Sequence, residues 1–94
     1  MITEYRIVCT LDVEHRDGKR FHYDLASAVW GGTHHRLETR KKSVAEEWLK
    51  QAQREVPFFE AKNHKRWEDP NDRNVIKYTQ TNIRIATRKV SEWK

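Results

Sequence analysis

Residues 4–13, EYRIVCTLDV, alternate apolar side chains with mostly polar ones, and the predicted fold is built on this stretch. Five apolar positions share one parity, Tyr5, Ile7, Cys9, Leu11 and Val13, and Val8 is the one apolar residue between them. Successive side chains of a strand point to opposite faces, so a period of two predicts a β-strand with one apolar face. Cys9 stands on that face and is expected in the core.

A hairpin turn is predicted next, at Asp17-Gly18, before a second strand that runs from Lys19. A two-residue turn would leave apolar residues on both faces of the ribbon, whereas a three-residue loop at 16–18 keeps them on one face. Gly18 then supplies the positive φ that the last loop position needs. The loop predicts four cross-strand pairs: Val13 with Phe21, Leu11 with Tyr23, Cys9 with Leu25 and Glu14 with Arg20.

The following segment is less regular. Residues 26–32 fit either an extension of the second strand to a turn at Gly31-Gly32 or a short helical turn. Residues 33–41 predict a third strand, rich in charge, with Leu37 as its only strong apolar anchor. Such a composition is typical of a strand at a sheet edge or with a solvated face.

A helix is predicted over residues 44–56, where Val44, Trp48, Ala52 and Val56 recur at a spacing of four. Ser43 and Glu46 fit a capping box at its start, and Pro57 is expected to end it. We expect Trp48 and Leu49 to pack against the apolar face of the first strand.

The remaining segments predict a loop and more sheet. Residues 57–74 lose the periodicity and are predicted to form a long loop with Phe58 and Phe59 in the core. Residues 75–90 are strand-like, but the apolar parity changes near 79–82, so two short strands and one long bulged strand both fit. The chain of 94 residues is therefore predicted to be a single domain (1–94) of the α+β class. It would have an antiparallel sheet of three to five strands with one main helix on one face.

Composition limits the function classes. A single cysteine excludes a secreted fold held by internal disulfides. Met1 leads into alternating residues and no run approaches about 18 apolar residues, so neither a signal peptide nor a membrane helix is expected. The cytoplasm is the expected location.

No catalytic or metal-binding pattern is apparent. The five histidines are scattered, and the adjacent pair His34-His35 would point to opposite faces of a strand. Cys9 lies in mid-strand on an apolar face, where a thiol is usually inert. No glycine-rich phosphate loop is present. We therefore expect no metal site, no cofactor and no enzymatic activity.

Charge gives the main functional signal. The formal net charge is +5, and residues 33–94 carry fifteen basic and nine acidic side chains. Basic clusters attract polyanions, and a tryptophan beside cations can stack on a base while the cations hold phosphates. We predict nucleic-acid binding, with DNA favoured, through seven residues: Arg36, Arg40, Lys41, Lys42, Lys65, Arg66 and Trp67.

Three alternatives stay open. The basic surface can serve solubility alone, or Glu38 can neutralise Arg36 and Arg40 as a ladder of surface charges. The chain can also be a protein-interaction module with no nucleic-acid role, of which a homodimer is a special case.

A family resemblance extends over residues 1–56. Tyr5-Arg6, the DGKR of residues 17–20 and the TRKKSVAEEWL of residues 39–49 resemble the arm-type N-terminal DNA-binding domain of tyrosine integrases. The resemblance implies a three-stranded antiparallel sheet followed by one helix, with the sheet laid in the major groove. It also implies an accessory protein of a phage or mobile element. The contact role would fall to Arg6, Arg20, Arg36 and Arg40.

Overall fold

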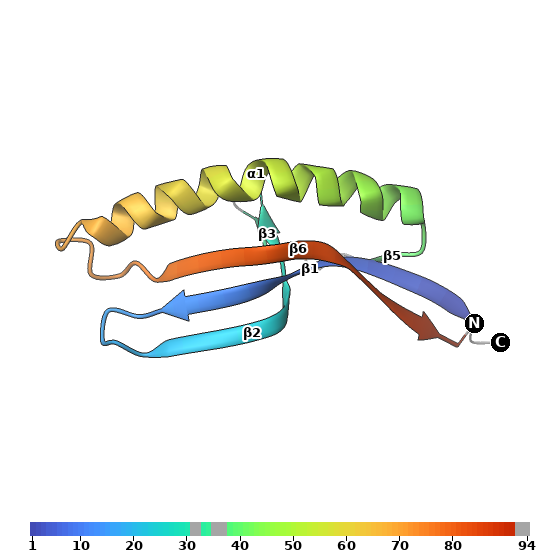
Figure 1. Cartoon of the computed structure of the whole chain (residues 1–94), viewed down its shortest axis with the longest axis horizontal. Coiled ribbons are helices and arrows are strands. Elements are labelled where there is room, and N and C mark those ends of the chain that lie inside the picture. The colour runs from blue at the N-terminus through green and yellow to red at the C-terminus, as the bar shows by residue number, and fades with distance from the viewer. Residues whose placement is uncertain (31–32, 35–37, 92–94) are drawn as a thin grey trace.

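The computed structural model describes residues 1–30, 33–34 and 38–91. Its elements follow in the order β1 (Ile2–Glu14), β2 (Arg20–Ser27), β3 (Val29–Trp30), β4 (Thr33–His34), β5 (Glu38–Thr39), α1 (Lys42–Glu68) and β6 (Lys77–Val90). The predicted α+β class is confirmed, because an antiparallel sheet and one long helix make up the fold (Figure 1).

The sheet is organised around β1. On one side β6 pairs with β1 along its whole length, from Ile2 opposite Val90 to Glu14 opposite Lys77. On the other side β2 pairs with residues 8–14 of β1, and β5 pairs with Tyr5 and Arg6. The short strands β3 and β4 form a separate two-stranded ribbon.

The predicted hairpin loop is confirmed. The His15 N–H donates to the Lys19 carbonyl at 2.9 Å, which closes the loop of residues 16–18, and Gly18 has a φ of 92°. The pairs Leu11–Tyr23, Val13–Phe21 and Glu14–Arg20 form as expected. The predicted pair of Cys9 with Leu25 is wrong: Cys9 faces Ala26, because β2 contains one extra residue between Tyr23 and Ala26.

Residues 77–90 form one long strand with a bulge, which settles the alternative left open by the sequence. Between Thr81 and Arg84 the strand β6 has two residues where β1 has only Cys9, and Asn82 takes a φ of 51°. The extra residue explains why the apolar parity changes along this segment.

The helix α1 is much longer than predicted. It spans 27 residues and contains Pro57, so its predicted end at Val56 is wrong. An interior proline costs about 3 kcal/mol of helix stability. Buried residues on both sides of Pro57, Val56 and Asn63, show that packing on the sheet offsets this cost. Ser43 is not the N-cap either: Lys41 is, with no side-chain hydrogen bond.

The predictions for the neighbouring segments need two further corrections. The long loop at 57–74 is wrong, since residues 57–68 are helical and Phe58 is 58% exposed instead of buried. The third strand at 33–41 is reduced to the short β4 and β5. Arg36 and Leu37 lie outside the described residues. Residues 26–30 continue β2 to Ser27 and then form β3.

The core lies between α1 and the helix-facing side of β1 and β6. Its buried members are Ile7, Cys9, Ala28, Trp30, Ala52 and Val56. Trp48 and Leu49 pack against this cluster, as predicted. Strand β3 leaves the sheet and rises toward α1, which carries Trp30 into the core (Figure 1).

The molecule is thin and elongated, with extents of 55 × 25 × 20 Å. The helix runs alongside β6. Strand β2 pairs with the opposite side of β1 and so lies away from the helix (Figure 1). Consequently Phe21 and Tyr23 of β2 stay 44% and 49% exposed. Within the described ranges, no helix is long and apolar enough to cross a membrane.

Candidate nucleic-acid interface

The three consecutive basic residues Arg40, Lys41 and Lys42 lie where β5 passes into α1. Lys41 is the N-cap residue, its N–H is bound by the Thr39 hydroxyl at 3.1 Å, and no acidic residue stands in the first helical turn. The first N–H groups of a helix lack intrahelical acceptors and carry partial positive charge. This end of α1 therefore joins side-chain cations to a helix terminus that favours anions.

The long β1–β6 pairing brings further cations to the same end of the molecule. Arg6 lies opposite Ala86, while Glu4 and Thr3 lie opposite Arg88 and Lys89. We call residues 1–6, 38–43 and 86–91 the cationic end; it includes the start of α1 and the outer ends of β1 and β6 (Figure 1). It carries six basic side chains and two acidic ones, a net of +4. One end of the described chain thus holds most of the formal charge of +5.

Both acidic residues of the cationic end are engaged in ion pairs. Glu4 contacts Arg88 at 3.0 Å and Arg40 at 3.9 Å, and Arg88 also contacts Glu38 at 3.0 Å. Hydrogen bonds from Arg88 hold the pKa of the Glu4 carboxyl below its usual 4.5. Among the described residues Glu38 therefore pairs with Arg88, and Arg40 reaches Glu4 instead of Glu38. The other member of the alternative ladder, Arg36, lies outside the described residues.

The other cations of this end have no acidic partner among the described residues: Arg6, Lys41, Lys42 and Lys89. The Lys89 ammonium donates to the Thr3 hydroxyl at 2.6 Å. The nearest helical carboxylates, Glu46 and Glu47, stand a turn further along α1. Uncompensated lysines held beside a helix terminus are suited to contact phosphate oxygens.

The second predicted group, Lys65, Arg66 and Trp67, lies at the opposite end of α1. Lys41 and Lys65 are separated by 24 helical positions, which corresponds to about 36 Å along the axis. The surrounding residues 12–24 and 60–79 carry eight basic and eight acidic side chains. The structure therefore does not join the two predicted groups into one basic face, and the second group sits in a neutral setting.

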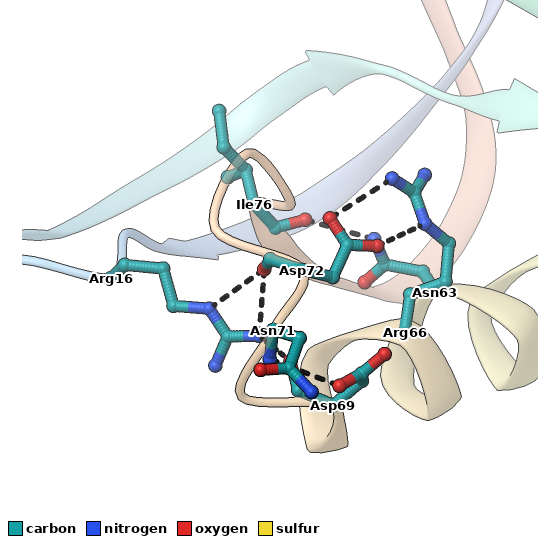
Figure 2. A network of polar contacts seen from close by, with 7 residues as sticks. All are labelled: Arg16, Asn63, Arg66, Asp69, Asn71, Asp72 and Ile76. Carbon is teal, nitrogen blue, oxygen red and sulfur yellow. Dashed lines mark hydrogen bonds and ion pairs between the residues drawn. The ribbon is translucent and has the colours of Figure 1, made fainter.

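Arg66 and Trp67 are held by contacts within the chain. Arg66 forms an ion pair with Asp72 at 2.9 Å in the turn between α1 and β6 (Figure 2). Arg16 of the hairpin loop reaches the same turn and donates to the carbonyls of Asp69 and Asp72 (Figure 2). The Arg16 guanidinium also lies 4.2 Å from the centre of the Trp67 ring. These contacts join the hairpin loop to the end of the helix.

The sheet face that the integrase resemblance would lay in DNA is charged but self-compensated near the hairpin. Arg20 pairs with Glu14 at 3.3 Å. His22 contacts Asp12 at 2.6 Å and Asp24 at 2.9 Å, and the hydrogen bond to Asp12 raises the pKa of the His22 imidazole. Arg20 is thus already neutralised, whereas Arg6 and Arg40 belong to the cationic end.

Sequence reasoning missed Lys89 as a site residue, and it named Arg6 only through the family resemblance. The basic cluster Arg84, Arg88 and Lys89 is visible in the sequence, but its position depends on a pairing register between strands more than 80 residues apart. No local signal gives that register.

No known protein family, no curated protein and no solved structure matches this chain.

Proposed function

We propose that this chain is a small non-enzymatic module that binds nucleic acid, DNA in the first place, by its phosphate backbone. The observation that carries the proposal is the net charge of +4 at the cationic end beside a neutral opposite end. Lysine and arginine contacts to phosphates displace condensed counterions, and this term supplies most of non-specific affinity. An accessory role in a phage or mobile element, and a cytoplasmic location, are consistent with such a partner.

The contact groups would be Lys41 and Lys42, with Arg40 beside them. Arg6 and Lys89 would add to them from opposite faces of the sheet at the same end. The helix N-terminus adds backbone N–H donors, which also bind phosphate oxygens. Because these groups recognise charge and not base edges, binding should depend little on sequence.

The test is a titration of labelled random-sequence duplex DNA, followed by fluorescence anisotropy at several salt concentrations. The double variant Lys41→Ala/Lys42→Ala should weaken binding, and the slope of log affinity against log salt should shrink by about two units. The matched control Lys62→Ala/Lys65→Ala removes the same charge from the neutral end and should change the slope little. Duplex RNA of equal length distinguishes the two nucleic acids.

Two results would refute the proposal. One is the absence of binding by the wild-type chain below about 100 μM at low salt. The other is an equal loss of affinity in both double variants, which would mean that net charge, and not the cationic end, governs binding.

A further inference from the structure

The outer edge of β2 is an exposed strand edge with apolar side chains. Within the described ranges, β2 pairs with β1 alone, and its residues Phe21, Tyr23 and Leu25 are 44%, 49% and 60% exposed. Folded proteins usually cover, shorten or charge such edges, because an open edge is a template for another strand. An eight-residue edge with three exposed apolar side chains therefore indicates a surface for strand pairing.

The backbone of β2 offers the hydrogen bonds that pairing needs. The loop closes with a bond between His15 and Lys19, and antiparallel ladders alternate bonded and non-bonded pairs. The Lys19 carbonyl and the backbone groups of Phe21 therefore face β1, and Arg20 and His22 direct their backbone groups outward. The Lys19 N–H instead donates to the Asp17 carboxylate at 3.0 Å. The outward N–H and C=O groups of Arg20 and His22 are what an added strand binds, whereas the Asp24 carbonyl already accepts from the Arg84 guanidinium at 2.9 Å.

The side chains of this edge are complementary to themselves. If two copies pair antiparallel about a twofold axis at His22, Arg20 lies opposite the partner's Asp24, and Phe21 lies opposite the partner's Tyr23. Each pair occurs twice because of the symmetry. Arg20 would then be shared between Glu14 of its own chain and the partner's Asp24. The two His22 side chains meet at the axis, each flanked by Asp12 and Asp24 of its own chain. Opposite charges and aromatic rings are favourable cross-strand neighbours. Both aromatic residues already lie on the helix-facing side, opposite Val13 and Leu11.

Neighbouring registers lack this match. An axis at Phe21 places Arg20 opposite the partner's His22 and leaves Asp24 opposite a glycine. An axis at Tyr23 pairs Phe21 with the partner's Leu25, but Leu25 lies on the other face, beside Arg6 and Arg88, because of the bulge. Only the axis at His22 joins both charge pairs and both aromatic pairs.

We propose that the partner of the β2 edge is a second copy of this chain, paired antiparallel about His22 to form one continuous sheet across the dimer. The proposal is independent of nucleic-acid binding, since β2 contributes no residue to the cationic end. The two can fail separately.

Sedimentation velocity from about 1 μM to about 1 mM tests the dimer without any nucleic acid. The wild-type chain should show a monomer–dimer equilibrium. Arg20→Asp and Asp24→Arg each create two like-charge pairs across the axis, so each should raise the dissociation constant at least about tenfold. An equimolar mixture of the two variants restores opposite charges at both positions and should dimerise nearly as well as the wild type.

The controls separate edge pairing from general charge effects. Glu47→Arg makes the same charge change as Asp24→Arg on the exposed side of α1 and should leave dimerisation unchanged. The variant Lys41→Ala/Lys42→Ala should also dimerise like the wild type. A wild-type chain that stays monomeric throughout overturns the proposal. So does a dimer that tolerates both single variants, or a mixture that associates no better than either variant alone.

Discussion

The side-chain amide of Asn63 pairs with the backbone at Tyr78 as a neighbouring strand would. Its Oδ1 accepts the Tyr78 N–H at 3.1 Å, and its Nδ2 donates to the Ile76 carbonyl at 2.8 Å. His64 donates to the Tyr78 carbonyl at 3.0 Å, and Glu60 accepts the Gln80 N–H. Side chains of α1 thus satisfy the outer edge of β6 over residues 76–80. On β2 the Arg84 guanidinium donates to the Asp24 carbonyl. Arg20 and His22 have no such cover within the described chain, which is why we assign this edge to a partner.

Asn63→Ala should destabilise the fold by about 2–4 kcal/mol, because it leaves a donor at Tyr78 and an acceptor at Ile76 unpaired in a site where Asn63 is only 8% exposed. Urea unfolding followed by far-UV circular dichroism measures the change. Asn71→Ala, in the exposed turn after α1, is the matched control and should cost little. Equal midpoints for the two variants would contradict the edge-capping role.

Pro57→Ala should stabilise the chain by about 1–3 kcal/mol. The substitution restores an N–H donor inside α1 and removes the ring that clashes with the preceding turn, while the freer unfolded chain reduces the gain somewhat. The same urea experiment applies, with Gln53→Ala on the exposed side of α1 as a control for helix propensity. A lowered midpoint for Pro57→Ala would show that the helix does not continue through this position in solution.

The Glu60 carboxyl should make stability depend on pH. Burial raises its pKa above 4.5, although the Gln80 N–H and His64 oppose the shift. A raised pKa means that the folded chain holds the proton more tightly, so this group stabilises the fold fully below pH 4.5 and loses that contribution as pH rises through the folded pKa.

Glu60→Gln keeps a side-chain acceptor without the charge, and should therefore gain stability relative to the wild type between about pH 4 and pH 7.5. Denaturant unfolding at both pH values measures the difference, with Glu47→Gln on the exposed side of α1 as the control. If the free energies of unfolding of Glu60→Gln and the wild type differed by the same amount at both pH values, Glu60 would be excluded as the source of the pH dependence.

Cys9 should react slowly with thiol reagents in the folded chain. It is fully buried, its thiol lies 3.6 Å from the Gln80 side-chain oxygen, and burial raises its pKa to about 11. Since the thiolate is the reactive form, modification at pH 8 should be at least about a hundredfold slower than in the urea-unfolded chain. The single cysteine makes the colour change of a disulfide reagent a direct readout. Similar rates in both states would contradict the burial of Cys9.

Sequence reasoning recovered the elements whose apolar pattern is local. The alternation in residues 4–13 and the glycine at the loop predicted β1 and its hairpin, and the spacing of Trp48, Ala52 and Val56 predicted the first half of α1. The second half was missed for a physical reason. It docks on a strand edge through Glu60, Asn63 and His64, so its inward side is polar and lacks the apolar period that marks a helix.

The candidate site was predicted only in part for a similar reason. Arg40, Lys41 and Lys42 are adjacent in the chain, so their cluster is visible in the sequence. Their neighbours Arg6 and Lys89 join them through the β1–β6 register, which no short stretch encodes. Trp67 has the aromatic-beside-cation pattern of a base-stacking residue, yet the guanidinium over its ring comes from Arg16, fifty-one positions earlier.

The pairing of Ile2 with Val90 has a consequence for biosynthesis. Within this fold the central strand β1 is made before the other elements, and its main partner β6 is made after them. Until β6 emerges, β1 can pack only with β2, β5 and α1, and its edge toward β6 stays unpaired along its whole length. The fold therefore depends on contacts between distant parts of the chain. Such topologies fold slowly, and their strand edges stay exposed until the distant partner strand has paired.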